Sequence, residues 1–117
     1  MLHHNSTRKL GRVSKQRTAL LRSLAISLIE KGKIQTTEAK AKELRPFIEK
    51  IITKAKDNTL ASKRLVLSRL GGSEKAMKKV FEKIAPEYTE REGGYTRVVK
   101  MSSRQGDASK RAIIELV

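Results

Sequence analysis

The first 29 residues of the chain contain no acidic side chain, and this stretch constrains the fold more than any other. Its N-terminal part, residues 1–13, has only four scattered apolar side chains, so it has too little to bury to fold on its own. We therefore predict an extended basic arm over residues 1–13 that becomes ordered on a negatively charged partner. A nucleic-acid backbone is the best candidate for that partner.

The overall charge supports the same class of partner. The chain has 27 basic and 12 acidic residues, a net charge of +15, whereas a merely soluble surface needs a magnitude of only about 2–8. With 117 residues, the chain is expected to form one domain over residues 14–117 after the arm. The absence of cysteine excludes disulfides and thiolate zinc sites and fits a reducing compartment, which we expect to be the cytoplasm.

Membrane and targeting segments are weakly supported. No apolar run approaches the roughly 20 residues that span a bilayer, and the apolar patch from Ala19 to Ile29 is interrupted by Arg22. A mitochondrial transit peptide stays open as an alternative, because the start is basic, contains serine and lacks acids. Against it, the helical pattern continues directly into the domain without a boundary.

The apolar spacing predicts helices in the first two thirds of the chain. Ser14 is expected to cap a helix from Lys15 to Lys31, which Gly32 ends. After a short strand over 33–36, Thr37 is expected to cap a second helix that reaches Lys56. Pro46 predicts a break in that helix near Arg45, because proline disfavours helical angles in the preceding residue.

The rest of the chain predicts two more helices and a hairpin. The third helix is expected over 60–70, ended by Gly71-Gly72, and the fourth from the cap Ser73 to Ala85, stopped by Pro86. Strands over 95–101 and 112–117 should pair as an antiparallel hairpin across a loop at 102–109. This order predicts an α+β fold with two layers, in which helices pack on one face of a small three-stranded sheet.

No catalytic centre is predicted, so we expect no enzymatic activity, cofactor, resident metal or small-molecule substrate. Carboxylates are few and mostly lie beside lysines, and the phosphate-binding glycine motifs are absent. One alternative is that His3, two backbone amides and a free amino terminus hold copper(II) in square-planar geometry. In the simpler interpretation, His3 and His4 hydrogen-bond or stack on nucleotides.

The candidate RNA-binding residues fall into two groups. Base stacking on a sheet needs several aromatic side chains and a zinc finger needs cysteines, so we expect contacts to phosphate, sugar and shape. Along the strand 95–101, Tyr95 and Arg97 are expected on one face. Lysines on the helices are read as a solvated face, because glutamates are interspersed. The arm and first helix supply His3, His4, Asn5, Ser6, Arg8, Lys9, Arg12, Lys15, Arg17 and Arg22, and the hairpin region supplies Arg91, Tyr95, Arg97, Lys100, Arg104, Lys110 and Arg111.

Five segments, which follow one another in the order and with the spacing of the family, resemble the bacterial ribosomal protein L17 family of the large subunit. They are N-S-T-R-K-L-G-R at 5–12, T-T-E-A-K-A-K-E-L-R-P at 36–46, G-G-Y-T-R at 93–97, G-D-A at 106–108 and A-I-I-E-L-V at 112–117. The resemblance implies a structural, non-enzymatic protein with a two-layer α/β fold that binds large-subunit ribosomal RNA. It also implies a position on the solvent side of the subunit near the polypeptide exit, in contact with neighbouring ribosomal proteins. The match from Met1 onward also speaks against a cleaved leader.

The chain departs from the family pattern at its start. Relatives usually carry arginine at the positions of Leu2 and His4, so two arm contacts to phosphate are in question, whereas Arg8, Lys9 and Arg12 match.

Two rival functions remain open. A nucleoid-type DNA-binding protein would share the positive charge, and an RNA-processing enzyme would need a clustered acid/base or metal site.

Overall fold

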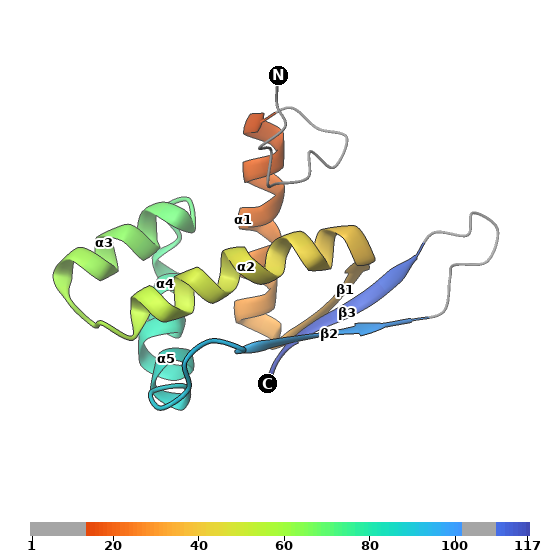
Figure 1. Cartoon of the computed structure of the whole chain (residues 1–117). Helices are drawn as coiled ribbons and strands as arrows, with labels where there is room; N and C mark the ends of the chain where they lie inside the picture. The colour runs from red at the N-terminus through yellow and green to blue at the C-terminus, as the bar shows by residue number, and fades with distance from the viewer. Residues whose placement is uncertain (1–13, 102–109) are drawn as a thin grey trace, which may run out of the picture.

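A three-stranded antiparallel sheet forms one layer of the fold, and helices form the other (Figure 1). The computed structural model describes residues 14–101 and 110–117. The strands are β1 (Lys33–Thr37), β2 (Thr96–Lys100) and β3 (Arg111–Leu116), and β3 lies in the centre. The two C-terminal strands pair as predicted, with Val98 opposite Ile114, and β1 joins the other edge of β3.

Alternation along the strands gives the sheet a core face and an open face. On β3, Ala112 and Ile114 are fully buried, whereas Ile113 between them is partly exposed. We call the surface on the side of Ile113 the open face, and all of its residues are exposed or partly exposed. It comprises Lys33, Gln35, Thr37, Arg97, Val99, Arg111, Ile113 and Glu115.

The first helix and strand follow the predicted boundaries closely. Helix α1 (Ser14–Lys31) ends at Gly32, whose φ of 82° places it in the left-handed region that glycine adopts without strain. Thr37 is the last residue of β1 and also the N-cap of α2 (Glu38–Ala55), where its hydroxyl accepts a hydrogen bond from the Lys40 N–H. No loop separates β1 from α2.

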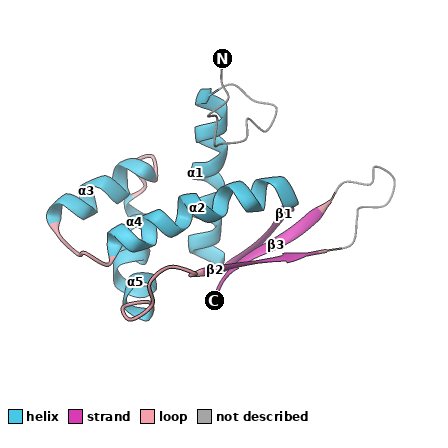
Figure 2. Cartoon of the chain, viewed as in Figure 1, coloured by secondary structure: helices cyan, strands magenta, loops and turns pink. Residues whose placement is uncertain are grey.

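The predicted break at Pro46 is wrong, because α2 continues through it as one helix of 18 residues (Figure 2). Leu44 and Ile48, on either side of the proline, are both fully buried on the same helix face, while Pro46 itself is exposed. The lost backbone hydrogen bond therefore lies on the solvent side. Burial of the continuous apolar stripe outweighs the local preference of proline.

The last helical segment ends within one residue of the stop predicted at Pro86, and it contains a π-helical turn. After α3 (Leu60–Arg69), which a capping box at Thr59 begins, the chain forms α4 (Glu74–Lys79), a π-helical turn η1 (Val80–Ile84) and α5 (Ala85–Glu87) in succession. The Ala85 N–H bonds to the Val80 carbonyl, a spacing of five residues. Pro86, which has no N–H, follows within the last turn, and the helical segment ends at Glu87, one residue beyond the predicted stop.

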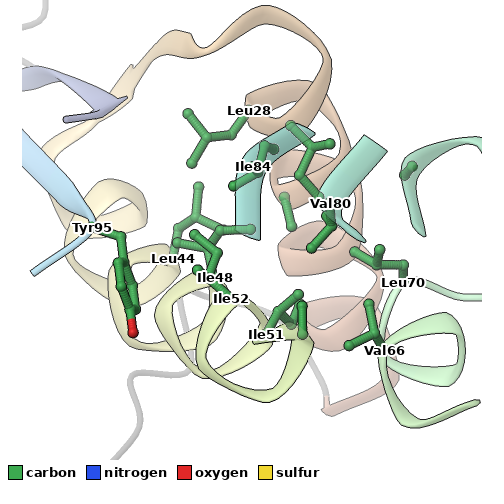
Figure 3. Close-up of a cluster of buried hydrophobic side chains, with 14 of the residues drawn as sticks. Leu28, Leu44, Ile48, Ile51, Ile52, Val66, Leu70, Val80, Ile84 and Tyr95 are labelled. Carbon is green, nitrogen blue, oxygen red and sulfur yellow. The ribbon is translucent and has the colours of Figure 1, made fainter. Parts of the chain in front are cut away.

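One aliphatic cluster joins the two layers (Figure 3). Its central members, Leu28 of α1, Leu44, Ile48 and Ile52 of α2 and Ile114 of β3, have no exposed surface. The fold is therefore α+β, with helices packed against a small sheet, as predicted.

Candidate nucleic-acid interface

Part of the predicted RNA-binding set lies outside the described residues and stays a prediction. In the arm and in the hairpin loop these residues are His3, His4, Asn5, Ser6, Arg8, Lys9, Arg12 and Arg104.

The cations of α1 differ in what surrounds them. Lys15 is exposed in the first turn, and Arg17 is partly buried. Arg22 is partly buried as well, and its side chain reaches the turn between α3 and α4, where its Cδ would lie 3.4 Å from a Cβ added to Gly71. The stem of Arg22 therefore packs within the domain, and this leaves Lys15 as the freely accessible cation of the three.

Two cations of β2 are close to carboxylates. The Nε of Arg97 donates to a carboxylate oxygen of Glu115 across the open face at 2.8 Å, and Lys100 Nζ lies 3.6 Å from Glu38. Exposed ion pairs contribute about 0–1 kcal/mol to stability, so their main effect here is on local charge. Both cations are still accessible, but their fields are partly cancelled.

Glu38 is the centre of a small cationic neighbourhood. Its carboxylate lies 2.9 Å from Lys42 Nζ, and this hydrogen bond is the main reason why the pKa of Glu38 is lowered. Partial desolvation acts in the opposite direction, and the charges of Lys42, Lys100 and Lys110 lower the pKa further. Glu38 therefore stays ionised, with its charge shared among these lysines.

Arg111 has no such partner among the described residues. It lies on the open face directly opposite Thr37, and its buried Nε forms no hydrogen bond within the described part of the chain. A buried donor without an acceptor costs about 1–3 kcal/mol. Arg111 borders a hollow of about 290 Å³, which is also lined by Gln35, Thr36, Thr37 and Lys40. Positive charge is thus concentrated where β1 meets α2, next to the exposed Lys110.

Tyr95 is a correction to the predicted set, because it is fully buried and cannot stack on a base in this structure. Its ring packs 5.1 Å from that of Tyr88, and its hydroxyl lies 3.1 Å from Thr53 Oγ1 and 3.2 Å from Lys56 Nζ. Gly94, with a φ of 65°, precedes it, and Tyr95 lies before the start of β2. The backbone turn directs the ring into the core instead of onto the face that carries Arg97.

The neighbouring Arg91 contacts both Tyr88 and Gly94. Its guanidinium lies 5.9 Å from the centre of the Tyr88 ring, and its Nη1 donates to the Gly94 carbonyl at 3.2 Å. Arg91 is nevertheless exposed, so these contacts leave room for a phosphate. It stays a candidate contact with an additional structural role.

Lys40 is a candidate that the sequence interpretation missed, since it was grouped with the solvated helix lysines. The sequence contained a signal for this position of Lys40. The residue follows the cap residue Thr37 by three positions, and the chain passes from strand to helix there without a loop. Lysines elsewhere remain consistent with a solvated face. On α4, Lys79 donates to the Glu30 carbonyl at 2.8 Å, and acidic side chains such as Glu82 lie among the lysines.

Other kinds of site find little support in the described residues. Residues 14–101 and 110–117 contain no group of three or more metal-ligating side chains. None of their helices is long and apolar enough to cross a membrane. A second hollow of about 560 Å³ lies between α2 and α3, but its rim mixes Lys50, Lys54 and Arg69 with Glu49 and Asp57.

Comparison with known proteins gives one consistent result. The family model described as ribosomal protein L17 matches residues 20–117. The large ribosomal subunit protein bL17 of Nautilia profundicola is 53% identical over 120 residues, covering 100% of this chain and 98% of the relative. Proteins of the same name from Gemmatimonas aurantiaca and Fusobacterium nucleatum are 52% and 51% identical over 117 residues, covering 100% of this chain and 98% and 100% of the relatives. The similarity therefore extends over the whole chain.

Proposed function

This chain belongs to the ribosomal protein L17 family, and on that premise we propose that it binds large-subunit ribosomal RNA through phosphate, sugar and shape. It is a structural constituent of the large ribosomal subunit. The observation that carries the RNA-binding proposal is the net charge of +15, which a free domain of this size would hold at the cost of self-repulsion.

The described surface supports backbone contacts over base readout. With Tyr95 in the core, the described part of the sheet presents no exposed aromatic side chain for stacking. It presents cations instead, among them Arg111 and Lys110 at the end of β3. Lys15 is a further exposed cation in the first turn of α1, just after the arm in the sequence. Phosphate contacts of this kind position a protein on RNA without reading its sequence.

We further propose that the arm, residues 1–13, orders on ribosomal RNA during assembly in the cytoplasm. In this proposal the protein lies near the polypeptide exit and touches neighbouring ribosomal proteins. Deleting residues 1–13 is expected to leave the domain folded, because residues 14–101 and 110–117 supply a buried cluster that spans the helices and the sheet. The deletion should greatly reduce incorporation into the subunit, and normal incorporation would contradict the role of the arm.

Sedimentation tests the proposal as a whole. The full chain, expressed with an affinity tag in a bacterium, should travel with the large subunit after a high-salt wash. A nucleoid-type DNA-binding protein would instead leave the subunit and bind duplex DNA at least as well as ribosomal RNA. Release from the subunit combined with preference for duplex DNA would overturn the proposal. Crosslinking within the purified subunit would test the location, since the expected neighbours are proteins around the exit.

A further inference from the structure

We propose that the hollow at the junction of β1 and α2 is a binding site for one phosphate of the ribosomal RNA backbone, with Arg111 and Lys40 as its two cations. This inference rests on the proposed function and names a site for it. The contact differs from the arm and from the charge of the surface as a whole, because its residues come from two strands and the first turn of a helix, whose positions the fold fixes.

The register of the sheet brings the site together. Thr37 and Arg111 are direct partners in the pairing of β1 with β3, and Gln35 lies two residues earlier on the same face. Because α2 begins at Glu38 without a loop, Lys40 follows within the first helical turn. Residues from two strands and one helix therefore line the same hollow of about 290 Å³.

The lining residues offer donors that no described residue uses. The Nε of Arg111 is buried, so the outer guanidinium nitrogens are the donors of Arg111 that a ligand in the hollow can reach. The Thr37 hydroxyl accepts the Lys40 N–H at 3.3 Å, so its own hydrogen is available to donate. Gln35 has a side-chain amide with two N–H donors. A tetrahedral oxyanion can accept hydrogen bonds from the outer guanidinium nitrogens of Arg111, from Thr37 and from Gln35, and can form an ion pair with Lys40.

The local charge makes an anion the expected ligand. Glu38 adjoins the hollow along the chain, but its carboxylate is held by Lys42 at 2.9 Å and lies 3.6 Å from Lys100. Arg97 on the same open face differs from Arg111, because Glu115 accepts its hydrogen bonds. The positive charge of Arg111 is therefore unneutralised within the described residues, although its Nε is buried.

A phosphate of RNA fits this set of groups better than a carboxylate of a neighbouring protein. The arginine fork recognises either anion, but threonine and glutamine side chains beside arginine and lysine are typical of contacts to nucleic-acid phosphate. The net charge of +15 also favours a partner whose negative charges repeat at regular intervals, as the phosphates of a nucleic acid do. An acidic protein segment in the hollow is the alternative that the experiment must separate.

The test measures binding of the full chain to deproteinised large-subunit ribosomal RNA over a range of salt concentrations. Arg111→Gln is compared with the matched control Arg64→Gln, which removes the same group from an exposed position on α3. We expect Arg111→Gln to weaken binding by about tenfold or more and to reduce the salt slope by about 1, whereas the control changes affinity by less than about threefold. Arg111→Lys, which keeps the charge but loses the fork, should fall between wild type and Arg111→Gln.

Lys40→Gln provides a second variant in case Arg111→Gln unfolds, which circular dichroism will reveal. It is expected to weaken binding by about three- to tenfold and to reduce the salt slope by about 1, like any lost phosphate contact. Nuclear magnetic resonance with inorganic phosphate gives a readout without RNA. Phosphate should shift the guanidinium signals of Arg111 and the amide signals around Thr37, and these shifts should persist in Arg64→Gln.

The outcomes separate this inference from the proposed function. If the wild-type chain fails to bind ribosomal RNA, the proposed function itself is wrong. If wild type binds but Arg111→Gln and Lys40→Gln match Arg64→Gln, the phosphate site is wrong and the proposed function stands. If Arg111→Gln binds RNA normally but loses crosslinks to a ribosomal protein in the subunit, the hollow holds a protein carboxylate and the inference is overturned.

Discussion

Replacing Tyr95 with phenylalanine removes a single hydroxyl group from the edge of the core (Figure 3). That hydroxyl lies 3.1 Å from Thr53 Oγ1 and 3.2 Å from Lys56 Nζ. Thr53 is exposed, and Lys56 also donates to the Arg91 carbonyl, so both partners can rebond to water or to the chain. The expected loss is therefore that of ordinary hydrogen bonds, about 1–2 kcal/mol.

Tyr95→Ala removes the ring as well and should cost far more. The side chain is fully buried and packs against Tyr88 with ring centres 5.1 Å apart. Truncation of a buried aromatic residue costs about 3–5 kcal/mol, to which the lost aromatic pair adds about 0.5–1.5 kcal/mol. Urea unfolding followed by circular dichroism measures both variants, and an unchanged denaturant slope would show that only stability changed. For a chain of this size, the phenylalanine variant should melt about 3–8 °C below wild type.

The same two variants test whether Tyr95 contacts RNA. Because its ring is in the core, Tyr95→Phe should bind ribosomal RNA with unchanged affinity after correction for the folded fraction. A loss of RNA affinity in Tyr95→Phe without a loss of stability would refute the argument. A cost of less than about 1 kcal/mol for Tyr95→Ala would refute it as well, since a buried ring cannot be removed so cheaply.

Three further predictions concern the backbone and the tyrosines. Pro46→Ala should raise the free energy of unfolding by about 1–2 kcal/mol in urea unfolding, because it restores a helical N–H at an exposed position, and a lower midpoint would contradict the role given to proline. Gly32→Ala should lower that free energy by about 1–2 kcal/mol, since the φ of 82° is strained for any side chain even though no atom of the described residues lies within 4 Å of the added methyl group. In an alkaline absorbance titration, Tyr95 should ionise before Tyr88. Burial raises the pKa of Tyr88, whereas at Tyr95 the effect of burial is outweighed by hydrogen bonds from Thr53, the Gly93 backbone and Lys56, so its pKa is lowered. The titration of Tyr88→Phe should keep the earlier step, and loss of that step would reverse the assignment.

Local signals in the sequence were sufficient to predict most of the fold. The apolar spacing of α1 and α2, the caps at Thr37 and Ser73, and the glycines after the helices each act within a few residues. Such interactions act in any folded chain that has a solvated surface and an apolar core, so they can be recognised without knowledge of the tertiary contacts. The α+β class followed from the order of these elements.

Pro46 shows where local reasoning fails. It lies within α2, because buried residues on either side of it keep the chain helical, whereas the helical segment that contains Pro86 ends at Glu87. The strength of that burial depends on the packing of α2 against the sheet and on the fit of η1 against the rest of the core. Neither contact can be read from a window of residues around the proline.

The sequence by itself determined the positive charge, the positions of the elements and the class of partner, because these depend on composition and short-range spacing. Only the tertiary structure decided which charges remain available. Arg97 and Arg111 are both arginines of the hairpin, yet strand register places Glu115 beside the first and Thr37 beside the second. The same packing places Tyr95 in the core and brings Lys40 and Arg111 to the lining of one hollow. Pairing across a sheet links residues far apart in the chain, so their relation exists only once the strands have found their register.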